Sequence, residues 1–114
     1  MDSCLFCALA AGKVKADIVY RDERIVAFKD VKPQAPVHLL LIPRKHLAGV
    51  LDIEPDDRLL IGEIFHVAAR LARDYGIADS GFRVVVNSGA DAGQSVFHLH
   101  YHLIGGRLMA WPPG

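Results

Sequence analysis

Histidine alternates with apolar residues in the stretch Gln94-Ser95-Val96-Phe97-His98-Leu99-His100-Tyr101-His102-Leu103-Ile104. Successive side chains of a β-strand point to opposite faces of its sheet. The pattern therefore predicts a strand over residues 96–104 that carries all three histidines on one face. The other face, which we expect in the core, holds Phe97, Leu99, Tyr101 and Leu103.

Three imidazoles in a row indicate a site that uses them, and three interpretations compete. The strand face could simply be a polar surface in solvent. It could bind zinc, because imidazole is a common zinc ligand. It could transfer a phosphoryl group covalently, with one histidine as nucleophile and the others as proton carriers or phosphate donors, because imidazole exchanges protons near neutral pH.

The loop before the strand favours phosphoryl transfer. It is polar and contains two glycines, and its notable residues are Asn87, Gly89, Gly93, Gln94 and Ser95. Backbone N–H groups in such a turn can form a concavity that binds anions. Amide and hydroxyl side chains add hydrogen-bond donors for phosphate oxygens. The plain alternative is a loop that only reverses the chain.

The rest of the chain predicts a small α+β protein with an antiparallel sheet. Apolar runs indicate strands over residues 18–21, 24–29, 37–42 and 82–86, and the first two read as a hairpin. A short helix over residues 4–11 is closed by Gly12. The strongest helix covers residues 55–75, where Pro55 suits the first helical position and Gly76 follows the last turn.

The long helix is apolar around much more than one face. Its main stripe is widened by Leu59, Ile61, Phe65 and Ala69. A helix of this kind is buried on two sides, so we expect a second copy of the chain to cover the outer side. The composition agrees, because 52% of the 114 residues are hydrophobic, which is high for a small domain with much surface.

Length and charge bound the function. The length suits one domain over residues 1–114. With 13 basic and 13 acidic residues the net charge is +0, which argues against a nucleic-acid or anionic-membrane binder, because such proteins carry a cationic surplus. No apolar run approaches the ~18 residues of a membrane span. The start, including Asp2, lacks the cationic segment of a signal peptide. The two closely spaced cysteines favour a reduced, cytoplasmic location.

The histidine stretch resembles the motif of the histidine-triad (HIT) family, His-φ-His-φ-His-φ-φ, where φ is apolar. The resemblance extends over nearly the whole chain to the Hint branch, the histidine-triad nucleotide-binding proteins. Its flanking matches are residues 30–38, 42–46, 87–89, 93–96, 105–107 and Trp111-Pro112-Pro113-Gly114. It implies a five-stranded antiparallel sheet with one long and one short helix. It also implies a homodimer with a continuous ten-stranded sheet, in which the tail 107–114 lies near the partner's site.

For function, the resemblance implies a purine nucleoside 5′-phosphoramidate hydrolase, which releases AMP or GMP from nucleotide–amine or aminoacyl-adenylate substrates. It makes His100 the nucleophile of a nucleotidyl-histidine intermediate, which water then hydrolyses. It makes His102 the phosphate and leaving-group contact with His38 in support, and His98 the residue that orients the strand. The reaction requires no metal cofactor, since hydrogen-bond donors can neutralise the phosphate.

The resemblance also implies a nucleotide pocket. It places Asp30 on the ribose, whose hydroxyls a carboxylate can accept; taken alone, Asp30 reads as a turn-capping residue. Around the base it places Leu5, Phe6, Leu9, Phe28 and Val31. The tail residue Trp111 is implied to act near the leaving group. The loop is expected to contribute Asn87, Gly93, Gln94, Ser95 and Val96.

Cys4 and Cys7 have the two-residue gap of a zinc knuckle and share one face of their helix. His46 and His98 could complete a Cys₂His₂ set, and the matching positions hold a structural zinc in some HIT proteins. Such a zinc would be remote from the phosphate. The alternative is a pair of small buried residues with inert thiols.

Two other functions stay open. A nucleotide-binding regulatory dimer would bind nucleotides with weak or no turnover. A dinucleoside polyphosphate hydrolase of the same superfamily would prefer diadenosine polyphosphates, although the short chain and its Trp-Pro-Pro-Gly tail favour the Hint branch.

Overall fold

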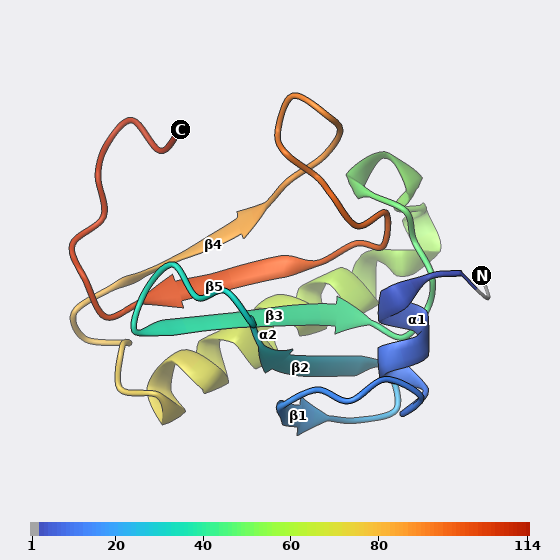
Figure 1. The fold of residues 1–114 in the computed structure, drawn as a ribbon, viewed down its shortest axis with the longest axis horizontal. Coiled ribbons are helices and arrows are strands. Elements are labelled where there is room, and N and C mark those ends of the chain that lie inside the picture. The colour runs from blue at the N-terminus through green and yellow to red at the C-terminus, as the bar shows by residue number, and fades with distance from the viewer. Residues whose placement is uncertain (1–2) are drawn as a thin grey trace.

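The computed structural model describes residues 3–114; Met1 and Asp2, part of the expectation about a signal peptide, lie outside them. The strands are β1 (Ile18–Arg21), β2 (Ile25–Lys29), β3 (Val37–Pro43), β4 (Phe82–Val86) and β5 (Tyr101–Gly105). The helices are α1 (Leu5–Ala10) and α2 (Arg58–Asp74), with 3-10 turns η1 (Val50–Asp52) and η2 (Pro55–Asp57). The strands form one antiparallel sheet in the order β1-β2-β3-β5-β4 (Figure 1). The predicted α+β class and five-stranded antiparallel sheet are confirmed.

The two helices cover opposite faces of the sheet (Figure 1). Alternate residues of β3 show how. Leu39 and Leu41 belong to the larger core cluster, which includes the buried side of α2, whereas Leu40 and Ile42 pack in the smaller cluster with Phe6 of α1. The apolar run from Leu39 to Pro43 in β3 is therefore that of a central strand buried on both faces.

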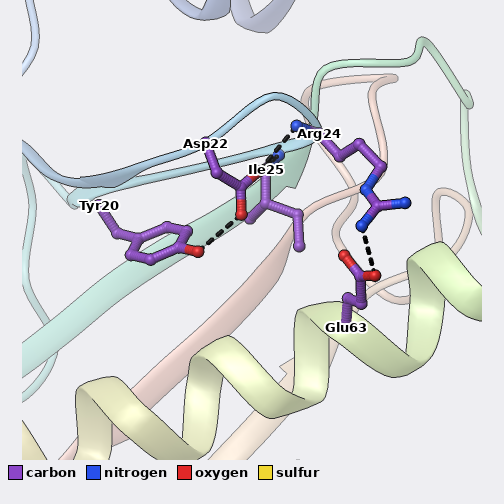
Figure 2. A network of polar contacts seen from close by, with 5 residues as sticks. All are labelled: Tyr20, Asp22, Arg24, Ile25 and Glu63. Atoms are coloured by element: carbon purple, nitrogen blue, oxygen red, sulfur yellow. Dashed lines mark hydrogen bonds and ion pairs between the residues drawn. The ribbon is translucent and has the colours of Figure 1, made fainter.

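Asp22 explains how the β1–β2 hairpin turns without a glycine. Its Oδ1 accepts hydrogen bonds from the backbone N–H groups of Arg24 and Ile25, each at 2.7 Å. Its Oδ2 accepts one from the Tyr20 hydroxyl at 2.6 Å. A side-chain carboxylate thus replaces the backbone bond of a tight turn. Arg24 also pairs with Glu63 of α2, so the same network joins the hairpin to the helix (Figure 2).

The strand predicted over residues 96–104 is shorter, because β5 begins only at Tyr101. Upstream of it the Pro43 carbonyl at the end of β3 accepts from the His98 side chain, and Leu99 N–H donates to Leu47 O at 2.6 Å in the following loop. These bonds replace a sheet ladder. The expectation that Phe97 lies in the core is wrong: it is 59% exposed. Leu99, Tyr101 and Leu103 are buried as expected.

The long helix predicted over residues 55–75 divides into the 3-10 turn η2 and then α2. The outer side of α2 carries Leu59 and Phe65, which are exposed. The apolar surplus expected on this helix therefore lies open in a single copy of the chain. Within residues 3–114, no helix combines the length and the apolar character needed to cross a membrane.

Removing one central side chain should measure how much the larger core cluster contributes to the stability of the fold. Leu41 is fully buried in β3, so we expect Leu41→Ala to lower the free energy of unfolding by about 2–5 kcal/mol. The matched control is Leu51→Ala, since Leu51 is 93% exposed; its effect should stay within about 0.5 kcal/mol. Urea unfolding measures both. Equal effects of the two changes would contradict this packing.

Candidate active site

A cavity of about 620 Å³ lies beside α1, the end of β2 and the stretch that precedes β5. Its volume is that of a pocket for a nucleotide-sized ligand. Many residues expected around a nucleotide line it: Leu5, Phe6, Leu9, Phe28, Asp30, Val31, Ser95, Val96, His100 and His102. The structure thus brings together residues from opposite ends of the chain, such as Leu5 and His102.

Four expected contacts lie outside that lining: Asn87, Gly93, Gln94 and Trp111. Gln94 is buried and shapes the loop instead. Its Oε1 accepts from Gly89 N–H at 2.9 Å, and its Nε2 donates to Ala48 O at 2.8 Å. Trp111 is 82% exposed in the tail. In this single copy the loop therefore reaches the cavity through Ser95 and Val96.

His100 is held in one tautomer by its own segment. Its Nδ1 lies 2.7 Å from the backbone carbonyl of His98. A carbonyl oxygen can only accept, so Nδ1 carries the hydrogen, and the lone pair of the neutral ring is on Nε2. His100 lines the cavity, with the ring of Phe6 packed edge-on against it at 5.2 Å between centroids. The arrangement fixes the ring and leaves Nε2 as the atom with a free lone pair.

The same reasoning assigns a chain of tautomers through His38 and His102. The backbone N–H of Gln34 donates to Nδ1 of His38 at 3.0 Å, so Nε2 of His38 carries the hydrogen. That Nε2 lies 2.9 Å from Nδ1 of His102 and 3.3 Å from Oδ2 of Asp30. His102 therefore accepts at Nδ1, and its Nε2 is the N–H donor. This buried Nε2 has no hydrogen-bond partner within residues 3–114, as a donor kept for a ligand would.

The supporting histidines are held neutral. The pKa of His102 is lowered to about 4. Burial is the largest cause, and the charges of His100 and His38 contribute to the same shift. Burial likewise lowers the pKa of His38, opposed by the Asp30 carboxylate, and burial lowers the pKa of His98. At neutral pH the site is therefore a set of neutral donors and acceptors without fixed charge on these rings.

These depressed pKa values make stability depend on pH. The three histidines bind protons less tightly in the folded protein than in the unfolded chain, where the pKa of histidine is about 6.5. The free energy of unfolding should therefore be undiminished above about pH 6.5 and fall as the pH drops toward the His102 pKa of about 4. Urea unfolding across this range checks it. His102→Gln, which cannot titrate, should show a shallower fall; an identical slope would contradict the role of His102.

A second cluster lies beside the active site. It consists of Cys4, Cys7, His46 and His98, whose ligand atoms all lie within 4.8 Å of one another. Three of the Sγ–Nδ1 distances are 3.2–3.5 Å: Cys4 to His98, Cys7 to His46 and Cys7 to His98. Ligands of a tetrahedral zinc, with Zn–S near 2.3 Å and Zn–N near 2.0 Å, lie about 3.5 Å apart. The cluster therefore matches the spacing of a Cys₂His₂ zinc site.

His98 has the tautomer that a metal ligand needs. Its Nε2 donates to Pro43 O at 2.7 Å, which leaves the Nδ1 lone pair facing both thiols. A backbone carbonyl behind a coordinating imidazole is the usual orienting partner. The other group with ligand-like spacing, Asp30, His38 and His102, does not fit a metal in the same way. There Gln34 N–H occupies Nδ1 of His38, so its Nε2 carries a proton where a metal would bind.

The histidine alternation, Asp30 and the Cys-x-x-Cys spacing all point from the sequence to residues that come together. The sequence does not point to the backbone groups that fix the tautomers, which are Gln34 N–H, Pro43 O and His98 O. Backbone atoms leave no residue-type signal, so only the folded chain shows them.

A family model described as "HIT domain" matches residues 11–109. An uncharacterized HIT-like protein of Synechocystis is 48% identical over 113 residues, which is 99% of this chain and 98% of that protein. The fold is similar to the crystal structure of a HIT family hydrolase from Legionella pneumophila, with a TM-score of 0.97. The two sequences are 47% identical, and the match covers 98% of this chain and 100% of the hydrolase chain. A zinc-bound histidine triad family protein from Mycobacterium smegmatis is 31% identical, with a TM-score of 0.79, over 93% of this chain and 76% of that one.

Proposed function

The chain belongs to the HIT family, and we propose that it is a Hint-branch hydrolase that cleaves the P–N bond of purine nucleoside 5′-phosphoramidates. His100 carries the proposal, because its hydrogen-bonded Nδ1 leaves a nucleophilic lone pair at Nε2 and its ring lines a nucleotide-sized cavity. The HIT family hydrolase from Legionella pneumophila, which shares the fold at a TM-score of 0.97, supports a hydrolytic activity.

In the first step Nε2 of His100 attacks the α-phosphorus, a P–N bond forms to the imidazole, and the bond to the leaving amine breaks. The amine leaves with a proton from Nε2 of His102, whose N–H has no other partner among the described residues. The substrate phosphate is an anion and raises the pKa of His102 when it binds, so that the ring takes up a second proton at Nδ1 and can release the one at Nε2. His38 then turns its N–H toward Asp30 Oδ2, 3.3 Å away.

In the second step water attacks the same phosphorus and releases the nucleotide. Nε2 of His102, which has given up its proton, accepts one from the water. The bond between phosphorus and His100 breaks, and the imidazole regains its lone pair. The sum is phosphoramidate plus water giving AMP or GMP plus amine. Ser95, which lines the cavity, supplies a hydroxyl donor for the phosphate oxygens.

The nucleoside is proposed to lie along α1 and β2, with Asp30 on the ribose and an apolar wall around the base: Leu5, Phe6, Leu9, Phe28 and Val31. Val31 is 93% exposed and Leu5 is half exposed, as expected for side chains that a bound base would cover.

We propose that two copies of the chain, each one domain over residues 1–114, form a homodimer with a ten-stranded sheet. The exposed Leu59 and Phe65 on α2 and the half-exposed Phe82 on the edge strand β4 support this arrangement. Trp111 and the rest of tail 107–114 would then lie at the partner's site. Gln94 holds the loop over residues 87–94 in shape.

We also propose that the Cys4, Cys7, His46 and His98 cluster holds a structural zinc. The tetrahedral spacing, the His98 tautomer and the zinc-bound relative from Mycobacterium smegmatis support it. A bound zinc supplies folding energy here and takes no part in the reaction. A reducing compartment such as the cytoplasm keeps these thiols available.

A substrate panel tests the proposed activity. Adenosine and guanosine 5′-phosphoramidates should be hydrolysed to AMP and GMP, and a diadenosine polyphosphate should be a much poorer substrate. Preference for the diadenosine polyphosphate would assign the other branch of the superfamily. Tight AMP binding without turnover of any phosphoramidate would assign a nucleotide-binding regulator.

Asp30→Asn tests the ribose contact. Loss of a charged hydrogen-bond acceptor should raise KM by about 10–100-fold. A 2′,3′-dideoxy substrate lacks the hydroxyls and provides the control, because wild type and variant should bind it alike. An equal loss with both substrates would contradict the ribose assignment and leave Asp30 with a role only at His38.

A further inference from the structure

One short helix belongs to both sites. On one side, α1 and its N-cap contribute Cys4 and Cys7 to the cluster that they form with His46 and His98. From the other side α1 contributes the apolar wall of the cavity through Leu5, Phe6 and Leu9. Whatever fixes the position of α1 therefore also fixes the wall of the proposed nucleotide pocket.

This helix has little stability of its own. It has six residues, carries no acidic residue in its first turn and no basic residue in its last turn. Isolated helices shorter than ~12 residues are marginal. Its N-cap is Cys4, whose Sγ accepts from Cys7 N–H at 3.3 Å, and a thiol is a weaker acceptor than the oxygens preferred at that position. Its placement therefore depends on contacts with the rest of the chain.

The apolar side of α1 packs in the smaller core cluster with Leu40 and Ile42, and its polar contacts lead to the Cys4, Cys7, His46 and His98 cluster and to His100. Sγ of Cys4 and of Cys7 lie 3.3 and 3.5 Å from Nδ1 of His98. His98 in turn gives its backbone carbonyl to Nδ1 of His100. Between the cysteines, Phe6 packs edge-on against both imidazoles, at 6.0 Å from His98 and 5.2 Å from His100.

From this geometry we propose that a metal ion in the cluster positions the pocket wall, so that zinc and nucleotide bind cooperatively. Four coordinate bonds would replace the weak thiol–imidazole contacts and fix α1 against the segment that carries His100. Zinc would then order α1 before the nucleotide binds. The entropy lost in ordering this helix would no longer reduce the affinity for the nucleotide. Cys7 and His46 act here as positioning residues. The inference rests on the proposed nucleotide pocket and goes beyond a zinc that only stabilises the fold.

Cooperativity between two ligands is reciprocal. Removing zinc should therefore weaken AMP binding by about tenfold, and saturating AMP should tighten zinc binding by the same factor. The kcat of a saturated enzyme should change much less than its KM, because His100 keeps its carbonyl partner in both forms.

The experiment uses the full chain, stripped of metal with a chelator and then reloaded with one equivalent of zinc. Calorimetry gives the Kd of AMP in each form. Competition with a chromophoric chelator gives the Kd of zinc with and without AMP. Cys7→Ser removes one ligand, and its AMP affinity should equal that of the stripped wild type and ignore added zinc. Ala11→Ser places the same hydroxyl on an exposed residue next to α1 and should keep the full response.

Three outcomes would overturn the inference. The first is an equal AMP affinity in stripped and zinc-loaded protein, which leaves the proposed hydrolysis intact. The second is a chain that binds no zinc but binds AMP and turns over phosphoramidates. The third is no AMP binding in either form, and only this one removes the proposed function as well.

Discussion

Replacing His100 with alanine should reduce phosphoramidate turnover by at least about 10³-fold, the scale seen when a covalent nucleophile is removed. The reason is specific to this ring. His98 O holds the Nδ1 hydrogen, so Nε2 is the lone pair available to phosphorus. Steady-state release of AMP from an adenosine 5′-phosphoramidate measures the loss.

Two controls make the result specific. Leu51→Ala changes an exposed residue that does not line the cavity and should leave turnover unchanged. AMP affinity of His100→Ala should change far less than its turnover, which separates lost chemistry from lost folding. Substantial turnover in a folded His100→Ala protein would mean that water attacks the substrate directly.

The second large effect is expected at His102, and it should depend on the leaving group. An alkylamine must take up a proton as it departs, so His102→Gln should slow hydrolysis of its phosphoramidate by about 10²–10⁴-fold. An aminoacyl-adenylate releases a carboxylate, which departs without a proton. The same variant should therefore retain most of its kcat/KM on that substrate, because kcat/KM reports the step that forms the intermediate. Its kcat should fall with both substrates, since His102 also accepts a proton from the water in the second step. The ratio of the two kcat/KM values, compared with wild type, is the measurement.

This ratio separates two roles for His102. A ring that only binds the phosphate would affect both substrates equally, because both carry the same phosphate. A ring that protonates the leaving group lowers kcat/KM for the alkylamine substrate alone, because kcat/KM does not include the later hydrolysis of the intermediate. Equal losses would therefore contradict the proton transfer through Nε2, although the phosphate contact would remain.

Much of the fold could be predicted from the sequence because its signals are local. The apolar run of β3 and the helical spacing of α2 each depend on one segment and its own period. The exposure of Phe97 and the late start of β5 could not be predicted, since alternation continues through residues 97–103 whether or not a neighbouring strand is there to pair. Where the pairing begins depends on Pro43, whose carbonyl accepts a hydrogen bond from the His98 side chain.

The chemistry-bearing side chains of the site could be predicted better than its geometry. The three alternating histidines and Asp30 carry their residue types openly, and the HIT resemblance joined them to His38. The backbone atoms that select each tautomer, and the sharing of α1 by two sites, arise from tertiary contacts that a linear pattern does not contain. The hairpin shows the same limit, because Asp22 makes a turn where a glycine would be the usual signal.

The covalent intermediate is the centre of this account. Intact mass spectrometry observes it most directly, on a reaction quenched rapidly at alkaline pH, where the P–N bond to histidine is stable. Mixing the protein with an adenosine 5′-phosphoramidate should give a transient species heavier by one adenylyl group, which peptide mapping places on His100. The species should decay as AMP appears and should be missing from His100→Ala. A wild-type reaction that turns over fully while the adduct never forms, or forms on another residue, would contradict the assignment of His100 as the nucleophile.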